Sequence, residues 1–479
     1  MKFKLTSAAV MASLVAGCAS YQPIAPKNTQ LHGVEIAVPA SSTGANGQWP
    51  SAQWWAAWND SQLNNLIERG LAQSPTLAVA QARIARAQAA SDMSRAASRP
   101  QVNAAVDASY GRQSENYLIP PPPLGDGGEY VSQGQAAVNF GMDLDLWGRN
   151  AALIRSADAQ LKAAAFDRDA ARLALTTSIA RAYLQLAGQY EMQDVLLATL
   201  KQRREIHKLI DQRVANGLDT QVEVKQAETN EAALQIELEQ LATSMKITRL
   251  QLAVLAGDMP AAAEKIARPS ARPASFAIPS SLPLDLLGRR PELAAQRARI
   301  TAAVGEADAA KAQFYPNINL NGLIGFQSIG LGQLFSAGSL MSSIGPAIRL
   351  PLFDAGRLRA NYAGKASDID LAIAQYNQSV LGAAQDVAEQ LTRIADLGRE
   401  EAATRNALNA AEEAHRLATL RYRGGLSPYL TVLTVETQLL TQRRAMAALK
   451  ARRDDLQVSL VRALGGGFAT DTATLAANR

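Results

Sequence analysis

Four segments of the chain alternate apolar and polar residues with a period of two. In the first of them, Val102 and Val106 share one face, while Asn103 and Asp107 share the other. The four segments span residues 101–111, 136–147, 317–327 and 342–353. Alternation over about ten residues predicts β-strands that have one apolar face and one polar face. The pattern is typical both of transmembrane barrel strands and of a soluble sheet packed on helices, so it leaves both structures open.

Two long stretches without proline, residues 124–259 and 352–427, carry helical periodicity instead. We expect four long helices, over residues 149–216, 218–256, 356–423 and 428–464. The first and third would each be about 100 Å long, because an α-helix rises roughly 1.5 Å per residue. Gly188 and Gly382 are candidate bends or breaks in those two helices. Apolar residues of the second and fourth helices follow alternating three- and four-residue steps, which predicts coiled-coil packing.

The chain contains two copies of one plan: a helix, a pair of strands and two long helices. Pro100 recurs as Pro316 at an offset of 216 residues, and Gly217 recurs as Gly425 at an offset of 208. The first copy therefore holds eight extra residues between Pro100 and Gly148. We expect the copies over residues 74–257 and 290–465, with a proline-rich linker over 258–289 and a tail over 466–479.

The start of the chain has the features of a secretory signal. Lys2 and Lys4 precede an apolar run over residues 5–16, which is too short to span a bilayer. The run ends in Leu-Val-Ala-Gly-Cys at Cys18, which resembles a bacterial lipoprotein cleavage box. The resemblance implies that residues 1–17 are a signal peptide and that Cys18 carries lipid on its sulfur and on the new N-terminus.

Cys18 is the only cysteine, so an intrachain disulfide is excluded. Ala19 and Ser20 follow it, and neither is the acidic type of residue that usually retains bacterial lipoproteins at the inner membrane. The resemblance therefore favours an outer-membrane protein, with residues 18–73 as its lipid-anchored N-terminal segment and the start of the first helix. An ordinary secreted protein with a single buried cysteine is the alternative.

Four strands cannot close a membrane barrel, and lipid does not tolerate open sheet edges. Roughly eight strands are the minimum, so two, three or four chains must share one barrel if the strands lie in a membrane. The lipoprotein signal favours the membrane over a soluble sheet. The proline- and glycine-rich stretch 120–128 suits an exposed connection between strands. Pro346 and Pro351 count against a central position for the last strand.

Charge and composition point away from nucleic acid and from catalysis. The formal net charge is +5, from 48 basic and 43 acidic residues, and no basic block with interleaved aromatic residues occurs. The histidines are His32, His207 and His415, and none lies in a predicted strand. We find no phosphate-binding loop, HExxH motif or cysteine cluster, so we expect no catalytic site, metal or cofactor. A metal-binding or pH-sensing role for His207 and His415, which are equivalent in the two copies, is the alternative.

The plan and four local motifs resemble the TolC/OprM outer-membrane factors, specifically their lipoprotein, NodT-like branch. The motifs are Trp54-Trp55 through Trp58-Asn59-Asp60, Leu282–Leu287 running into Arg289-Arg290-Pro291, Arg421-Tyr422-Arg423-Gly424-Gly425, and Leu464-Gly465-Gly466-Gly467. The resemblance implies an α+β membrane protein: a homotrimer with a shared transmembrane β-barrel, four strands per chain, and a long α-helical coiled-coil barrel in the periplasm. It also implies docking to a periplasmic adaptor (membrane fusion) protein and to an inner-membrane transporter of the resistance-nodulation-division type.

The resemblance assigns two kinds of site. The adaptor-docking tips are at Arg213, Gly217 and Leu218 and at Arg421, Gly425 and Leu426. The periplasmic gate is at Leu430, Thr431 and Thr434, where this chain departs from the family because threonines replace the expected acidic residues. A threonine ring binds cations less well than a carboxylate ring, so the gate is hydrophobic or uses Glu436 or charges elsewhere.

The implied function is an outer-membrane channel of a tripartite efflux pump, which passively conducts drugs or other toxic solutes to the exterior. Two other classes stay open. A structural coiled-coil lipoprotein would keep its strands outside lipid, and an outer-membrane barrel enzyme would need a Ser/His or metal constellation in the barrel. The cargo is not legible in the sequence, because the pump selects it.

Overall fold

The computed structural model describes residues 23–31, 49–116, 123–124, 128–270 and 289–468. The signal peptide, Cys18, most of the linker and the motif at residues 282–287 lie outside these ranges. The chain divides into two compact units. The sheet unit comprises residues 1–30, 84–164 and 296–375, and the helical unit comprises residues 31–83, 165–295 and 376–479. Both copies of the repeated plan contribute to each unit.

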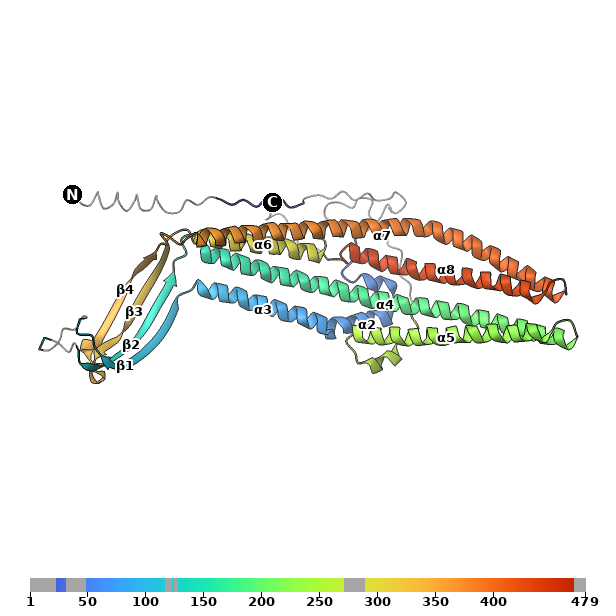
Figure 1. The fold of residues 1–479 in the computed structure, drawn as a ribbon, viewed down its shortest axis with the longest axis horizontal. Helices are drawn as coiled ribbons and strands as arrows, with labels where there is room; N and C mark the ends of the chain where they lie inside the picture. Colours follow the sequence, from blue (N-terminus) through green and yellow to red (C-terminus); the bar gives the residue numbers. More distant parts are fainter. Residues whose placement is uncertain (1–22, 32–48, 117–122, 125–127, 271–288, 469–479) are drawn as a thin grey trace. The chain divides into compact units, whose positions relative to one another are not determined.

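The sheet unit contains one antiparallel sheet in the order β1-β2-β3-β4 (Figure 1). The strands are β1 (Gln101–Arg112), β2 (Tyr130–Asp143), β3 (Asn317–Ile329) and β4 (Leu340–Arg349). β1 and β4 form the two edges, so Pro346 lies in an edge strand, where a missing N–H is tolerated. The first copy supplies β1 and β2, and the second supplies β3 and β4.

Two strands differ from their expected bounds of 136–147 and 342–353. β2 leaves the ladder after Asp143, because Asp145 takes a left-handed backbone conformation with φ of 44°. Its carboxylate then accepts hydrogen bonds from the N–H groups of Asn150 and Ala151, each at 2.9 Å, and so begins the next helix. β4 ends at Arg349, just before Pro351, which has no N–H to donate.

The strand register aligns the alternating residues into one apolar and one polar face. Val106 pairs with Ala136, which pairs with Phe326 on the apolar face. Asp107 pairs with Gln135, which pairs with Gln327 on the polar face.

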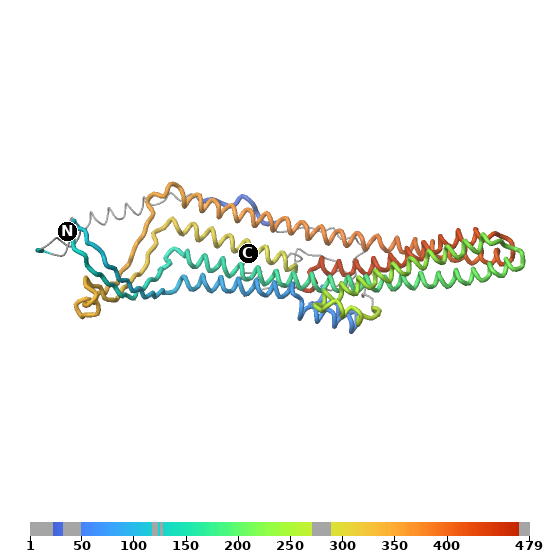
Figure 2. Tube along the Cα trace, turned by 60° about the horizontal axis from the view of Figure 1, so that its bottom comes forward, coloured from blue at the N-terminus to red at the C-terminus, as the bar shows by residue number. Residues whose placement is uncertain are grey.

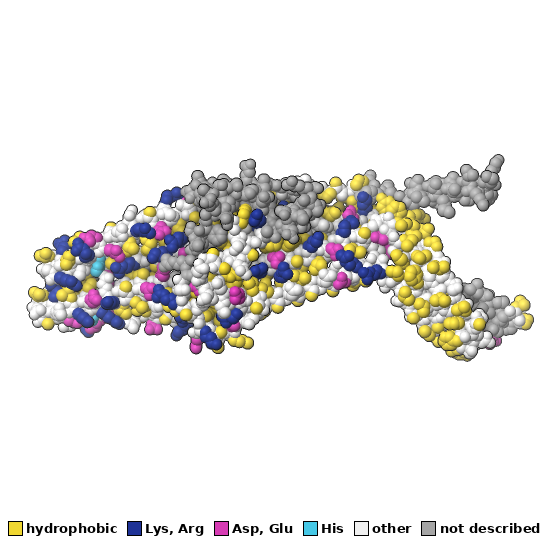
Figure 3. All heavy atoms as spheres, turned by 180° about the vertical axis from the view of Figure 1, so that it is seen from behind, with side chains coloured by type: hydrophobic (Ala, Val, Ile, Leu, Met, Phe, Trp, Pro, Cys, Tyr) yellow, Lys and Arg dark blue, Asp and Glu magenta, His cyan; other side chains and the backbone are white. Residues whose placement is uncertain are grey.

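Among the described residues, much of the apolar face is uncovered. Val106 is 76% exposed and Ile344 is 77% exposed. Figure 3 shows hydrophobic side chains gathered over the strands, whereas charged side chains lie mainly over the helices. A soluble sheet packed on helices would bury these residues, so the exposed apolar face favours contact with lipid.

The helices follow the same plan in each copy. The first copy has α3 (Pro75–Ala97), α4 (Arg149–Ala215) and α5 (Gln221–Leu255), and the second has α6 (Pro291–Ala312), α7 (Arg357–Arg423) and α8 (Tyr429–Ala463). The expected order of helix, two strands and two long helices is confirmed. α4 and α5 form one antiparallel hairpin, and α7 and α8 form the other (Figures 1 and 2). Among the described residues, no helix is long and apolar enough to cross a membrane.

Gly188 and Gly382 were expected to mark bends or breaks; a break is wrong at both, because α4 and α7 are helical throughout, and a bend stays a prediction. Gly188 instead permits close packing: a Cβ there would lie 2.9 Å from the Cβ of Ala451 in α8. A Cβ at Gly382 would have no atom within 4 Å, so packing does not require glycine at that position.

The tryptophan motif forms part of the core of the helical unit. Trp54 and Trp55 belong to a short 3₁₀ helix, η2 (Trp54–Trp58), which precedes α2 (Ser61–Gln73). Their rings meet edge to face at 5.6 Å between centroids. Asp60 caps α2 through the N–H groups of Gln62 and Leu63 and accepts the Tyr183 hydroxyl hydrogen bond at 2.7 Å. The motif is therefore structural, because it fixes α2 against α4.

The long hairpins pack through leucines. One buried cluster joins Leu196 and Leu200 of α4 to Leu234 of α5 and Leu440 of α8. At the base of α8, a Cβ on Gly465 would lie 2.0 Å from the Arg289 carbonyl oxygen, and the glycine has φ of 85°. Only glycine allows this approach, which explains why the glycine motif accompanies the arginine motif.

Candidate docking tips and gate

Each helical hairpin of the helical unit turns at a glycine in the left-handed conformation. Gly217 has φ of 73° and Gly425 has φ of 72°. In the first tip, the N–H of Leu218 donates to the Arg213 carbonyl at 2.8 Å, and in the second the N–H of Leu426 donates to the equivalent carbonyl at 2.8 Å. These are Schellman motifs, in which a residue without Cβ avoids the penalty of positive φ.

The tips expose apolar side chains. Leu218 is 63% exposed and Leu426 is 73% exposed, and Arg421 beside the second turn is also exposed. Covering a leucine that is exposed at the end of a rigid hairpin is favourable, because the partner removes its apolar surface from water. The two leucines are therefore candidate contact points for another protein.

Arg213 lies inside the tip, because its side chain is only 13% exposed. Its Nε donates to Oδ2 of Asp219 at 2.8 Å, and its Nη1 donates to the main-chain carbonyl of Tyr422 at 3.2 Å. The hydroxyl of Tyr422 donates to the same Asp219 oxygen. The guanidinium also lies 4.7 Å from the centre of the Tyr422 ring. We call Arg213, Asp219 and Tyr422 the tip network.

The tip network joins the two copies of the repeat. Burial alone would raise the pKa of Asp219, but hydrogen bonds from Arg213 and Tyr422 outweigh it and hold that pKa below its usual value. Burial and the adjoining Asp219 carboxylate raise the pKa of Tyr422, so its hydroxyl stays protonated and donates. The network therefore holds one full negative and one full positive charge at neutral pH.

The network breaks the symmetry of the repeat. The position equivalent to Asp219 in the second copy is Ser427, whose hydroxyl is buried without a hydrogen-bond partner in the described structure. Arg421, which is equivalent to Arg213, has no ion pair within the described part of the chain. Asp219 was not among the functional residues expected from the sequence. The sequence did contain one signal: the two tips otherwise match, but the acidic residue of the first copy is replaced by serine in the second.

The expected gate residues share one surface at the start of α8. Leu430 is 61% exposed, and Thr431 and Thr434 are exposed beside it. The Thr434 hydroxyl donates to the Leu430 carbonyl at 2.9 Å, so it is satisfied within its own helix. The neighbouring Val432 faces the core and is fully buried. The exposed surface of this turn is therefore formed by one large apolar side chain and uncharged hydroxyls.

Residues 66–258 and 282–466 match the family model described as outer membrane efflux protein. The chain belongs to this family. The multidrug resistance outer membrane protein MdtP of Escherichia coli K12 is 33% identical over 466 residues, 95% of this chain and 94% of that protein. The fusaric acid resistance protein FusA of Burkholderia cepacia is 30% identical over 98% of this chain and 90% of its own length. The solved structure of VceC from Vibrio cholerae has a TM-score of 0.82 and 38% identity, covering 88% of this chain and 100% of that one.

This efflux protein is an outer-membrane channel of an efflux pump. Its family consists of channels, which are not enzymes, and its relatives are outer-membrane proteins. The geometry fits this family, because the exposed apolar sheet face suits lipid and the long hairpins end in exposed leucines.

Glu436 cannot serve this efflux protein as an exposed gate charge. It is 2% exposed and pairs with Nε of Arg203 in α4 at 3.1 Å. Arg203 also donates to the Asn230 carbonyl of α5. Burial raises the pKa of Glu436 even though Arg203 opposes the change. The pair joins α8 to the other hairpin, so the proposed use of Glu436 at the gate is wrong.

The equivalent histidines of the efflux protein have different partners. Nδ1 of His207 lies 2.8 Å from Oε1 of Glu231, whereas Nε2 of His415 lies 2.7 Å from Nε2 of Gln202. Burial lowers the pKa of His415, which favours its neutral form. Among the described residues, no group of three or more His, Cys, Asp or Glu side chains is placed to hold a metal ion.

Proposed function

We propose that three copies of this efflux protein share one transmembrane β-barrel and one periplasmic helical barrel. The carrying observation is the four-stranded sheet, whose edge strands β1 and β4 each pair on one side only within the described chain. Unpaired edges are not tolerated in lipid, and four strands are fewer than the roughly eight of the smallest membrane barrels. A homotrimer satisfies both requirements by pairing β1 of one chain with β4 of the next.

In this proposal the apolar face of the sheet contacts outer-membrane lipid, and the polar face lines a water-filled pore. Solutes pass through without chemical change, so the protein does not act as an enzyme and needs no cofactor. The names of MdtP and FusA, which refer to multidrug resistance and fusaric acid resistance, support drugs or other toxic solutes as the class of cargo. A periplasmic adaptor and an inner-membrane transporter of the resistance-nodulation-division type supply cargo and energy.

We propose separate roles for the residues at the tips. Leu218, Leu426 and Arg421 contact the adaptor, and the glycine turns at Gly217 and Gly425 let it approach closely. Arg213 acts from inside, because it positions both turns through the tip network. Leu430, Thr431 and Thr434 form the gate, which closes by apolar contact between copies rather than by an acidic ring.

The proposal for the whole assembly is tested by deletion and complementation. Deleting the gene should sensitise the host to at least one drug, metal or solvent in a toxicity panel, and the wild-type gene should restore resistance. The complementing protein should migrate as a heat-modifiable trimer in the outer-membrane fraction. Unchanged sensitivity to every compound would contradict the efflux role, and a soluble monomer would contradict the shared barrel.

We further propose that Cys18 carries the lipid anchor, after removal of residues 1–17. Cys18→Ser should abolish incorporation of labelled palmitate and leave the precursor uncleaved, because the lipoprotein pathway requires a cysteine thiol at this position. Ala19→Ser is the matched control and should be labelled normally. Persistent palmitate in the serine variant would place the lipid elsewhere and contradict this anchor.

A further inference from the structure

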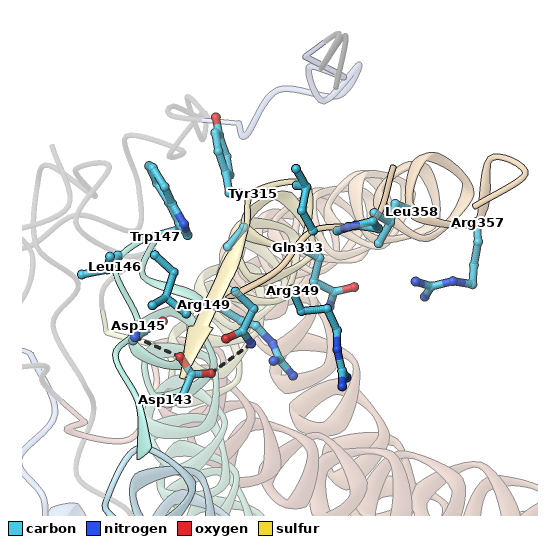
Figure 4. A pocket seen from close by; sticks show the side chains of 15 residues that line it. Asp143, Asp145, Leu146, Trp147, Arg149, Gln313, Tyr315, Arg349, Arg357 and Leu358 are labelled. Atoms are coloured by element: carbon cyan, nitrogen blue, oxygen red, sulfur yellow. Dashed lines mark hydrogen bonds between the residues drawn. The ribbon is translucent and has the colours of Figure 1, made fainter. Parts of the chain in front are cut away.

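The sheet unit contains a pocket of about 400 Å³ where the strands meet the helices. Arg149, Arg349 and Arg357 all line it, together with the carboxylates of Asp143 and Asp145. Figure 4 shows Arg149, Arg349 and Asp143 on one side of the pocket and an aromatic pair on the other. That pair, Trp147 and Tyr315, is stacked at 4.8 Å between ring centroids. The pocket therefore combines three cations with an aromatic wall.

The carboxylates in the pocket are occupied by groups other than the arginines. Asp143 accepts from the Asp145 N–H at 2.9 Å and from Nδ2 of Asn317 at 3.3 Å. Asp145 accepts two N–H groups at the start of α4, each at 2.9 Å. These two carboxylates carry two negative charges against the three positive charges of the arginines, and their hydrogen bonds go to other groups.

The arginines have no such partners. Within the described part of the chain, none of their three guanidinium groups forms an ion pair or a hydrogen bond. Nε of Arg149 is buried from solvent and lacks an acceptor. A buried guanidinium N–H without an acceptor is costly, and an oxyanion supplies the missing acceptor in the geometry that arginine prefers.

The strand register places the polar lining residues Asp143, Asn317 and Arg349 on the polar face of the sheet. Asn317 pairs with Arg349, and Asp143 pairs with Asn319, so all four residues lie on that face. The apolar face carries Ile348 and Ile318, and Ile318 also lines the pocket at the end of its strand. The polar face lines the pore in the proposed function, and the following inference rests on that function.

We propose that this pocket binds the anionic group of a solute in transit, such as a carboxylate, phosphate or sulfonate, and that it gives the pore a preference for anions. Every chain of the assembly contributes the same arginines at the same level of the pore. Rings of arginine are one of the ways in which channels favour anions. The neighbouring Trp147 and Tyr315 offer an apolar surface to the organic part of such a solute.

The first test measures binding of inorganic phosphate to the purified full-length assembly by equilibrium dialysis. Wild type should bind phosphate, and Arg149→Gln with Arg349→Gln should weaken binding about tenfold or more, because charge-assisted hydrogen bonds are lost. Arg86→Gln, on the exposed surface of α3 in the same unit, is the matched control and should bind like wild type. Equal binding by wild type and the double variant would overturn the proposal.

The second test measures the reversal potential of single channels in a planar bilayer under a KCl gradient. Wild type should prefer chloride, and the double glutamine variant should lose that preference. Arg149→Lys with Arg349→Lys should keep the preference for chloride but bind phosphate less tightly, because lysine keeps the charge and loses the fork of donors. If the glutamine variant fails to assemble, phosphate binding by the lysine variant can still be compared with that by wild type.

The two tests separate the possible sources of the anion. If the double variant loses phosphate binding yet keeps the wild-type reversal potential, the site faces lipid headgroups, and the pore-side proposal is overturned. If phosphate binds through the arginines but no preparation conducts, the anion site stands and the proposed conduit fails. Lost binding together with a lost preference for chloride supports both the anion site and its place in the pore.

Discussion

Gly425→Trp is expected to abolish export while the trimer still assembles. The glycine has φ of 72°, and a Cβ there would have no atom within 4 Å, so the indole enters open space rather than the core. The fold loses only the local cost of a side chain at positive φ, about 1 kcal/mol. The ring projects from the turn beside Leu426, where it blocks a partner that approaches the tip. Accumulation of a pump substrate in complemented deletion cells measures the effect.

The control for this prediction is Gly425→Asn. Asparagine tolerates the left-handed conformation better than other residues with a side chain and adds little bulk. It should therefore export at close to the wild-type rate. Normal export by the tryptophan variant would remove the second tip from the docking surface, and failure of both variants with loss of the trimer would show a structural role instead.

Asp219→Ala is expected to produce the largest loss of local stability at the tips. The change leaves the Arg213 guanidinium, whose side chain is 13% exposed, without its carboxylate partner. Breaking a buried ion pair from one side costs about 3 kcal/mol, which corresponds to roughly hundredfold faster hydrogen exchange. Exchange of the N–H groups of Gly217 and Leu218 measures it directly. Tyr422→Phe is the graded comparison, because it removes one hydrogen bond and should cost about 1 kcal/mol.

The tip network also has a predicted dependence on pH. The pKa of Asp219 lies below its usual value of 3.8 in the folded chain, so the unfolded chain binds more protons there as the pH falls. The stabilisation is therefore fully present above about pH 5 and is lost only as the pH falls through the lowered folded value. Exchange at the tips should not respond to the Asp219 titration between pH 5 and 8. A response in that range that disappears in Asp219→Ala would contradict the network.

A double variant tests whether the stability lost in Asp219→Ala comes from the Arg213 cation that is left without a partner. Arg213→Ala combined with Asp219→Ala removes the stranded cation as well, so the double variant should be more stable than the Asp219→Ala single variant. If the two are equally unstable, the carboxylate acts through its own hydrogen bond to Tyr422 rather than through the ion pair.

The pattern of apolar and polar residues predicted the strands and helices, because these elements depend on local periodicity. Alternation revealed the strands, and helical periodicity in stretches without proline revealed the long helices, because both periods repeat every few residues. The first half of β2 was missed, because residues 130–135 include Gly134 and two glutamines and do not alternate. Their pairing with β1 fixes them as strand. Gly188 looked like a break because its close contact with Ala451 is invisible along the sequence.

The sites were harder to predict for the same reason. Arg213 could be matched to its repeat equivalent, but its burial depends on Tyr422, which is 209 residues away. Glu436 was a candidate for the gate until Arg203, 233 residues away, was seen to pair with it. The arginines of the sheet unit were not candidates at all, because only the register of four strands places Arg349 beside Asn317.

The central claim is that several chains close one barrel through β1 and β4. Disulfide cross-linking between the two edges tests it most directly, because Cys18 is the only native cysteine and carries lipid in this account. Ala105→Cys on the polar face of β1 is combined in turn with cysteine at each polar-face position of β4. These positions are Met341, Ser343, Gly345, Ala347 and Arg349. Ala105→Cys with Ile344→Cys is the control, because Ile344 lies on the opposite face.

Oxidised outer membranes from these cells are separated on a denaturing gel without reductant. The account predicts that at least one polar-face pair yields a ladder of monomer, dimer and trimer that ends at the trimer, while the opposite-face control stays monomeric. A ladder that ends at a dimer or continues beyond a trimer would contradict the number of chains, and the absence of cross-linking with every pair would contradict the shared barrel.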